Sequence, residues 1–507
     1  MKAEKKNNNR KWQTFFLILI VVSVLLGLFY LPRTTLADVE TRRVNILSDV
    51  QRRDKEGNIV AEVKADSADG FVEQKVDSNA IQVKQIAYVD TVPKGMVAIE
   101  DFSSEASHRE MDKFYAALSQ AHDRPVRIAY FGDSYIEGDI LTMDLRGLLQ
   151  QKYGGKGVGF VEIACVSSDF RRSATTRRSG WNRYHANERG RGFKSAFQSL
   201  AGSYFIPSGT ATYEVRGQKN VYPHLLDTAE VATVYFTPGS GLNINYALNG
   251  GSYSSLFSNG ESHEPETYQE TIEVRDSDSV VHYKTVTRTV PVPQQDAGQI
   301  TAKSVKGRIG RFSMTVTGGG GSRFYGVALD GLRGISVDNY SMRGSGGQHL
   351  GGIPSETLRE FATLRPYDLI IVHYGLNVAN EKQKDYGGYT SQLGKSIEQL
   401  KAAFPHASIL VVSMGDRDKR GADGKMHTMR GVTEMVSYLR KMASDHHVAF
   451  WNLYEAMGGD GSLSRMTERK EANLDYTHIN FAGGRHLAGL LYDVLMNGKE
   501  NYDNRVR

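Results

Sequence analysis

The stretch FGDSYIEGD, residues 131–139, decides the fold. It follows a largely apolar run, 127–131, that is typical of a buried strand, and it precedes leucines with helical spacing between 141 and 149. A serine in such a strand-to-helix turn lies at the sheet edge, where the following helix favours developing negative charge. Because Gly, Asp and Ser are also ordinary turn residues, Ser134 is a candidate nucleophile only if partners follow downstream.

Composition narrows the function classes. The chain has 507 residues, enough for several domains, and its net charge of +5 is too mild to indicate a nucleic-acid binder. A single cysteine, Cys165, excludes an intramolecular disulfide and a cysteine-based zinc site. The sequence also lacks a His-Glu-x-x-His motif, so we expect no metal and no cofactor. From the mild charge we expect no nucleic-acid partner either.

The N-terminus predicts the compartment. Residues 15–31 are uncharged and just long enough to cross a bilayer core of about 30 Å, and the tail 1–14 before them is basic. Since basic flanks stay inside, we expect a single-pass anchor in the inner membrane, with the rest of the chain on the periplasmic side. The alternative is secretion to the periplasm after cleavage of a signal peptide near Thr35-Leu36-Ala37.

Composition shifts divide the remaining chain. Residues 32–98 carry many charges and few aromatics, which indicates a stalk or lead-in. Residues 99–170 and 336–498 alternate apolar strands with helical stretches, the pattern of a parallel sheet, and 499–507 form a tail. Between them, 171–335 shows short alternating runs separated by turn residues, which predicts a β-sandwich. The expected architecture is one α/β domain interrupted by an inserted β domain.

Polar residues follow the predicted strands where such a sheet places its ligands, at the carboxyl ends. A glycine-rich turn containing Gly344 follows one strand, and Gly375-Leu376-Asn377 follows another. Near the C-terminus, Asp475 and His478 lie three residues apart, before the closing helix. A base and an orienting carboxylate at this spacing complete a possible acyl-transfer site with Ser134.

This order of motifs resembles the SGNH or GDSL hydrolase superfamily. Its four blocks match here as Gly132-Asp133-Ser134, the Gly344 turn, Gly375-Leu376-Asn377 and Asp475-Tyr476-Thr477-His478. The similarity covers about 99–170 and 336–498, and one departure is Val378, where families with Gly-x-Asn-Asp have an aspartate. The resemblance implies a three-layer, flavodoxin-like hydrolase domain with a parallel sheet.

The resemblance also implies roles. Ser134 is expected to attack an acyl carbonyl, His478 to take its proton and Asp475 to hold the imidazole. The backbone N–H groups of Ser134 and Gly344 and the amide of Asn377 are expected to form the oxyanion hole.

Each of these positions also fits an ordinary structural role. His478 fits a surface or capping group, and Asn377 fits a turn cap. Gly346 and Gly347 lie in the same turn as Gly344, so either of them fits the donor position.

A basic segment adds a second feature. Residues 171–194 hold eight Lys/Arg against one Glu, with aromatic residues between them. In an exported protein this pattern favours an anionic or sugar polymer, with Trp181 and Tyr184 stacking on sugar faces and Arg183 binding nearby. A solvated loop fits equally well.

A β domain inserted between the serine and glycine blocks resembles one branch of the superfamily, the peptidoglycan O-acetylesterases with a carbohydrate-binding-like module. The resemblance implies a serine esterase that removes O-acetyl groups from a cell-envelope glycan. One alternative is a membrane-anchored extracytoplasmic O-acyltransferase for a polysaccharide or wall polymer, with a membrane-bound acyl-donor partner. Another is a non-catalytic glycan-binding envelope protein.

Overall fold

The computed structural model describes a defined part of the chain. That part comprises residues 82–83, 85–164, 170–259 and 298–507, the hairpin strands 267–275 and 281–289, and four short strands before residue 61. The predicted anchor, 15–31, lies outside these residues. No helix within the described part is long and apolar enough to cross a membrane.

Two units divide the chain, Met1–Glu73 and Gln74–Arg507. The first contains the antiparallel pairs β1 (Thr35–Leu36) with β2 (Val39–Glu40) and β3 (Arg52–Arg53) with β4 (Ile59–Val60). All elements below belong to the second unit.

A seven-stranded sheet organises the α/β domain. Its order is β19 (Gly334–Ser341), β7 (Pro125–Gly132), β20 (Leu369–His373), β21 (Ser408–Val412), β24 (Ala449–Trp451), β6 (Ile99–Asp101) and β5 (Tyr88–Val89). The first five strands are parallel, whereas β6 and β5 add antiparallel edges. The central strands are covered on both faces, since Ile128, Ala129 and Tyr130 of β7 are all buried.

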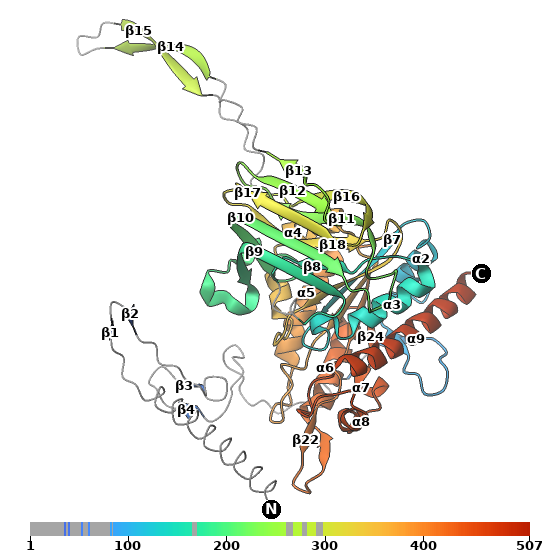
Figure 1. Cartoon of the computed structure of the whole chain (residues 1–507). Coiled ribbons are helices and arrows are strands. Elements are labelled where there is room, and N and C mark those ends of the chain that lie inside the picture. Colours follow the sequence, from blue (N-terminus) through green and yellow to red (C-terminus); the bar gives the residue numbers. More distant parts are fainter. Residues whose placement is uncertain are drawn as a thin grey trace, which may run out of the picture. The chain divides into compact units, whose positions relative to one another are not determined.

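Helices accompany this sheet in two groups. Helices α3 and α9 pack against each other, and α4, α5 and α6 pack in succession (Figure 1). The bounds are α2 (Asp112–Ser119), α3 (Thr142–Tyr153), α4 (Ser355–Leu364), α5 (Gly387–Ala403), α6 (Gly431–Asp445), α7 (Leu453–Ala456), α8 (Ser462–Glu468) and α9 (Phe481–Val506). The 3₁₀ turns are η2 (Glu137–Asp139), η4 (Ala186–Arg191), η5 (Ser195–Phe197) and η6 (Gln348–Gly352), and a small ribbon pairs β22 (Asp418–Arg420) with β23 (Met426–Thr428).

The additional β domain is a nine-stranded antiparallel sheet that encloses its own apolar core. Its main path is β13 (Ser254–Ser258), β12 (Asn243–Leu248), β17 (Phe312–Thr317), β10 (Ser203–Gly217), β18 (Arg323–Asp330), β11 (Ala229–Thr237) and β16 (Thr301–Ile309). Off this path, β8 (Gly159–Glu162) pairs with β18 and β9 (Ala174–His185) pairs with β10. A separate hairpin joins β14 (Thr267–Arg275) to β15 (Val281–Thr289).

The observed strands run past the predicted edges of the insertion. Strand β8 precedes residue 171 yet belongs to the antiparallel sheet. Strand β19 begins at Gly334 and already pairs with β7. The β domain therefore extends from β8 to the end of β18, residues 159–330.

A buried ion network joins the two domains. The fully buried guanidinium of Arg365, just after α4, donates to Asp338 on β19 at 2.5 Å and to Asp330 at the end of β18 at 2.7 Å. Asp338 also accepts the backbone N–H of Phe160 on β8 at 2.8 Å. One cation thus connects the sheet, the insertion and a helix.

We expect the substitution Arg365→Met to lower the free energy of unfolding by about 3–5 kcal/mol, because it leaves the carboxylates of Asp330 and Asp338 buried without their cation. Urea denaturation measures this. Arg359→Met is the matched control on α4, where the arginine pairs with Glu356 on the surface, and it should cost less than about 1 kcal/mol. Equal effects of the two substitutions would contradict this account of the joint.

Candidate active site

Ser134 lies in the turn that follows β7, at the carboxyl end of a central parallel strand. The residue is 6% exposed, and its Oγ has no hydrogen-bond partner among the described residues. Its backbone N–H is likewise unpaired in that part of the chain. A buried hydroxyl without a partner is unusual and needs an explanation, such as a role toward a ligand.

The turn around Ser134 is held by carboxylates. Asp133 accepts the N–H of Tyr135 at 3.1 Å, and burial, the largest influence, raises the pKa of Asp133 to about 7. Asp139 has a left-handed φ of 65° and accepts from Thr142 at 2.6 Å and from Arg146 at 3.0 Å. These contacts fix where the turn leaves the strand and enters α3.

The structure brings Asp475 and His478 together. His478 Nδ1 lies 2.7 Å from Asp475 Oδ2, and Asp475 Oδ1 accepts the N–H groups of Thr477 and His478, each at 3.0 Å. Burial alone would raise the pKa of Asp475, but these hydrogen bonds outweigh it, so the pKa lies below its usual value. His478 and Asp475 thus form a hydrogen-bonded imidazole–carboxylate pair.

Electrostatic interactions place this pair near the Ser134 turn. Burial raises the pKa of Glu137, while the charges of Arg343 and His478 oppose that rise. The charge of His478 thus acts on Glu137, which lies three residues after Ser134. The structure shows no hydrogen bond between Ser134 and His478, and such bonds often tighten only when substrate is bound.

The glycine-rich turn lies beside the same strand end. The N–H of Met342 donates to the carbonyl of Gly132 at 2.9 Å, which fixes the turn to the end of β7. Gly344 has a φ of 73°, a left-handed conformation that favours glycine, and its N–H has no partner among the described residues. Two unpaired backbone donors, at 134 and 344, are therefore present.

Asn377 differs from these two donors. Its Nδ2 donates to Asp133 Oδ2 at 3.2 Å and to the carbonyl of Ser345 at 3.1 Å. Both amide hydrogens are therefore engaged in the structure, and an oxyanion would have to replace one acceptor.

The residues predicted to bind substrate all lie on β9 and have intramolecular partners. The indole N–H of Trp181 donates to the carbonyl of Thr212 at 2.8 Å. Tyr184 stacks on Tyr204 with ring centroids 4.9 Å apart. Arg183 forms an ion pair with Glu188.

Arg343 is the site residue that sequence reasoning missed. Its largely exposed side chain lies 3.5 Å from the carboxylate of Glu137, and its carbonyl accepts from Asn187 of the insertion at 2.9 Å. The available signal was a charged residue directly before Gly344.

Among the described residues, no group of three His, Cys, Asp or Glu side chains could hold a metal ion.

Comparisons with known proteins show the fold. No protein-family model matches the sequence, and no curated protein matches it. One solved structure, titled "Peptidoglycan O-acetylesterase in action, 5 min", superposes with a TM-score of 0.59 at 17% identity, covering 79% of this chain and 99% of its own. A family two carbohydrate esterase from Cellvibrio japonicus reaches a TM-score of only 0.22 at 9% identity, with 65% of this chain and 99% of its own covered, a value too low to indicate a shared fold. The chain thus has a mixed α/β architecture resembling that of a solved esterase, with an additional β domain.

We expect Asp133 to make folding pH-dependent. Its pKa is about 7 in the folded protein and near 3.8 when unfolded, so the folded state binds the extra proton and stability falls as the pH rises between about 4 and 7. Asp133→Asn cannot ionise, so its free energy of unfolding should fall less steeply over that range. Urea denaturation of both proteins at several pH values measures the difference. Parallel curves would show that Asp133 does not titrate in this window.

Proposed function

We propose that the chain is a serine esterase that removes O-acetyl groups from a cell-envelope glycan such as peptidoglycan. The observation that carries the proposal is the buried Oγ of Ser134 at the end of β7, which has no hydrogen-bond partner among the described residues. The hydrogen-bonded His478–Asp475 pair supports it, because His478 acts electrostatically on Glu137 in the same turn. In this proposal the α/β domain is a three-layer, flavodoxin-like hydrolase domain of the SGNH type.

The chemistry follows from the geometry. Because His478 Nδ1 is engaged by Asp475, Nε2 remains to accept the proton of Ser134 as Oγ attacks the acetyl carbonyl carbon. The tetrahedral intermediate expels the sugar oxygen, which takes that proton from His478, and an acetyl-serine remains. Water, deprotonated by His478, then attacks the acetyl-serine, and acetate leaves as Ser134 recovers its proton.

The N–H groups of Ser134 and Gly344 would supply charge stabilisation without giving up a hydrogen bond within the described part of the chain, where neither has a partner. Asn377 is the third proposed donor. A preorganised donor of this kind is typically worth about 3–4 kcal/mol in the transition state.

The glycan substrate is supported by the fold-level likeness to a peptidoglycan O-acetylesterase and by the additional β domain. The motif resemblance supports the same assignment. We also propose that residues 15–31 anchor the chain in the inner membrane with the site in the periplasm, a proposal supported by sequence alone.

Ser134→Ala should lower the release of acetate from O-acetylated peptidoglycan by more than about 1000-fold, since the nucleophile is lost. The assay incubates the full-length protein with O-acetylated peptidoglycan or acetylated xylan, with and without a chito-oligosaccharide acceptor, and measures free acetate and acetylated acceptor. Ser252→Ala, on an exposed loop of the β domain, is the matched control and should leave the rate unchanged.

Serine-dependent free acetate would support the esterase, and the preferred polymer would define its substrate. Acetylated acceptor with little free acetate would replace it by the acyltransferase. Neither product from any donor would favour a glycan-binding protein without catalysis.

Asn377→Ala should lower kcat by about 100- to 1000-fold with a smaller change in KM, because an oxyanion donor acts in the transition state. Steady-state kinetics on the acetylated polymer measures this. A variant with unchanged kcat but a lower melting temperature would assign Asn377 to holding Asp133 and Ser345 in place instead.

A further inference from the structure

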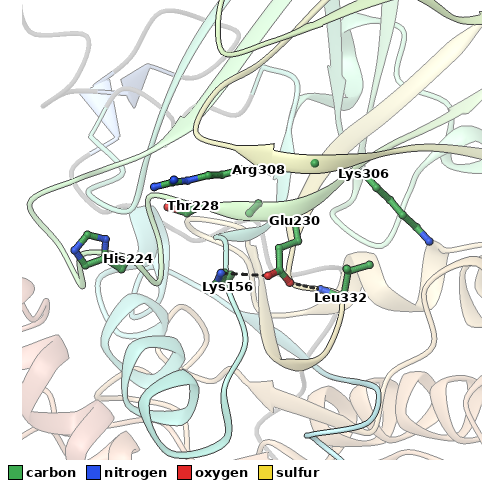
Figure 2. Close-up of a pocket in the computed structure, with 9 residues that line it drawn as sticks. Lys156, His224, Thr228, Glu230, Lys306, Arg308 and Leu332 are labelled. Atoms are coloured by element: carbon green, nitrogen blue, oxygen red, sulfur yellow. Dashed lines mark hydrogen bonds and ion pairs between the residues drawn. The ribbon is translucent and has the colours of Figure 1, made fainter.

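A basic cleft lies at the junction of the two domains, outside the candidate active site. It encloses about 490 Å³ and is lined by β11, β16, the loop after α3 and the loop before β19 (Figure 2). Among the described residues, three cationic side chains, Lys156, Lys306 and Arg308, line it together with His224, against a single carboxylate, Glu230.

Both carboxylate oxygens of Glu230 have partners within the cleft. Its Oε1 lies 3.1 Å from Lys156 Nζ, and its Oε2 accepts the N–H of Leu332 at 2.9 Å. The hydrogen bond from Leu332 is the largest influence on the pKa of Glu230, which lies below its usual value. The carboxylate therefore stays ionised, and its charge offsets those of Lys156 and, more weakly, Arg333.

Lys306 and Arg308 remain as uncompensated charges. Both side chains are exposed, and neither has an ion-pair partner among the described residues. A recess lined by excess charge of one sign concentrates ligands of the opposite sign. The cleft therefore favours an anion.

A β-bulge sets the spacing of these two cations. Ala229 on β11 pairs with Ile309, but Val231 pairs with Lys306, so β16 carries an extra residue here. A bulge redirects the side chains around it. In Figure 2, Arg308 extends toward Thr228 while Lys306 extends away from it. Two separated charges suit an extended anion with repeated charges better than one small ion.

The backbone that forms the floor is fixed before any ligand arrives. Gln150 donates from Nε2 to the carbonyls of Gly157 and Ile335, each at 3.1 Å. The N–H of Gly157 also donates to the carbonyl of Leu225 at 2.7 Å. Lys156 is therefore held between α3, β19 and the β domain.

The cleft lies far from the Ser134 turn. Leu332 precedes β19, and the Gly344 turn follows it, so the eight residues of that strand separate the two places. At about 3.3 Å per residue this is roughly 26 Å. A small ester cannot contact both places, whereas a polymer can.

We propose that this cleft binds an anionic polysaccharide through carboxylate or phosphate groups and holds the polymer while the distant site acts on it. The second half of this statement rests on the proposed esterase function, whereas the binding itself does not. None of the described residues that line the cleft is Phe, Tyr or Trp, so they offer no stacking surface of the kind that single-stranded nucleic acids use.

The test measures binding without turnover. Fluorescence anisotropy with the full-length protein compares four labelled probes of similar length: oligogalacturonate for carboxylates, polyphosphate for phosphates, neutral dextran and a single-stranded oligonucleotide. None carries an acyl ester, so the outcome is independent of catalysis. The parent protein is expected to bind the anionic sugar or polyphosphate but not dextran, with affinity that falls as salt is added.

The double substitution Lys306→Glu/Arg308→Glu should weaken anion binding by about tenfold or more, because both positions reverse sign. Lys395→Glu, at an exposed position on α5, is the matched control and should bind like the parent. The melting temperature of each variant checks its fold, and Lys306→Gln/Arg308→Gln replaces the double variant if that unfolds.

The preferred anion identifies the group recognised, since tighter binding of oligogalacturonate assigns the cleft to carboxylates and tighter binding of polyphosphate to phosphates. Equal affinities of the parent and a folded double variant would overturn the proposal, as would equal binding of dextran. Tightest binding of the oligonucleotide would assign the cleft to nucleic acid.

Discussion

The joint between the two domains depends on one buried cation, Arg365. A guanidinium removed from water costs several kcal/mol unless charged partners surround it. Here the partners belong to different parts of the fold: Asp338 lies on β19 and Asp330 ends β18. Only three residues connect these two strands, so the chain that leaves the insertion is fixed in direction as it enters the parallel sheet. The β domain is therefore joined to the α/β domain through buried ion pairs.

A second buried charge holds the chain just before β9 of the insertion. Asp139, in the turn after Ser134, accepts from Arg171 at 2.9 Å as well as from Arg146, and it contacts Ser173. Burial alone would raise the pKa of Asp139, but the two arginines outweigh it and lower the pKa. Arg171 and Ser173 immediately precede β9. The position of the Ser134 turn consequently depends on the insertion as well as on the sheet.

Sequence reasoning predicted the features that short-range sequence patterns determine. The apolar run and leucine spacing predicted a strand and a helix on either side of Ser134, and β7 and α3 lie there. The three-residue spacing of Asp475 and His478 likewise anticipated their contact, because a short turn brings such side chains together.

The features that sequence reasoning missed depend on distant pairing. Strand β8 resembles any short apolar strand, and only its contact with β18, more than 150 residues away, assigns it to the antiparallel sheet. Nothing in the sequence around Arg365 indicates that it is buried, because arginine is mostly exposed in proteins. The carboxylates that it binds, on Asp338 and Asp330, lie 27 and 35 residues away. The aromatic and basic side chains of β9 contact partners within the chain, such as Thr212 and Glu188. The pattern of β9 alone does not indicate these partners.

The engagement of Asn377 by Asp133 connects burial to the proposed chemistry. An ionised Asp133 would hold the amide hydrogen strongly and would also repel an oxyanion forming beside Ser134. A protonated Asp133 is a weaker acceptor and carries no charge, so the amide can turn to the oxyanion at lower cost. Burial raises the pKa of Asp133 to about 7 and thereby favours the neutral form at acidic pH. The desolvation that destabilises an ionised carboxylate in the turn thus favours the donor arrangement proposed for acyl transfer.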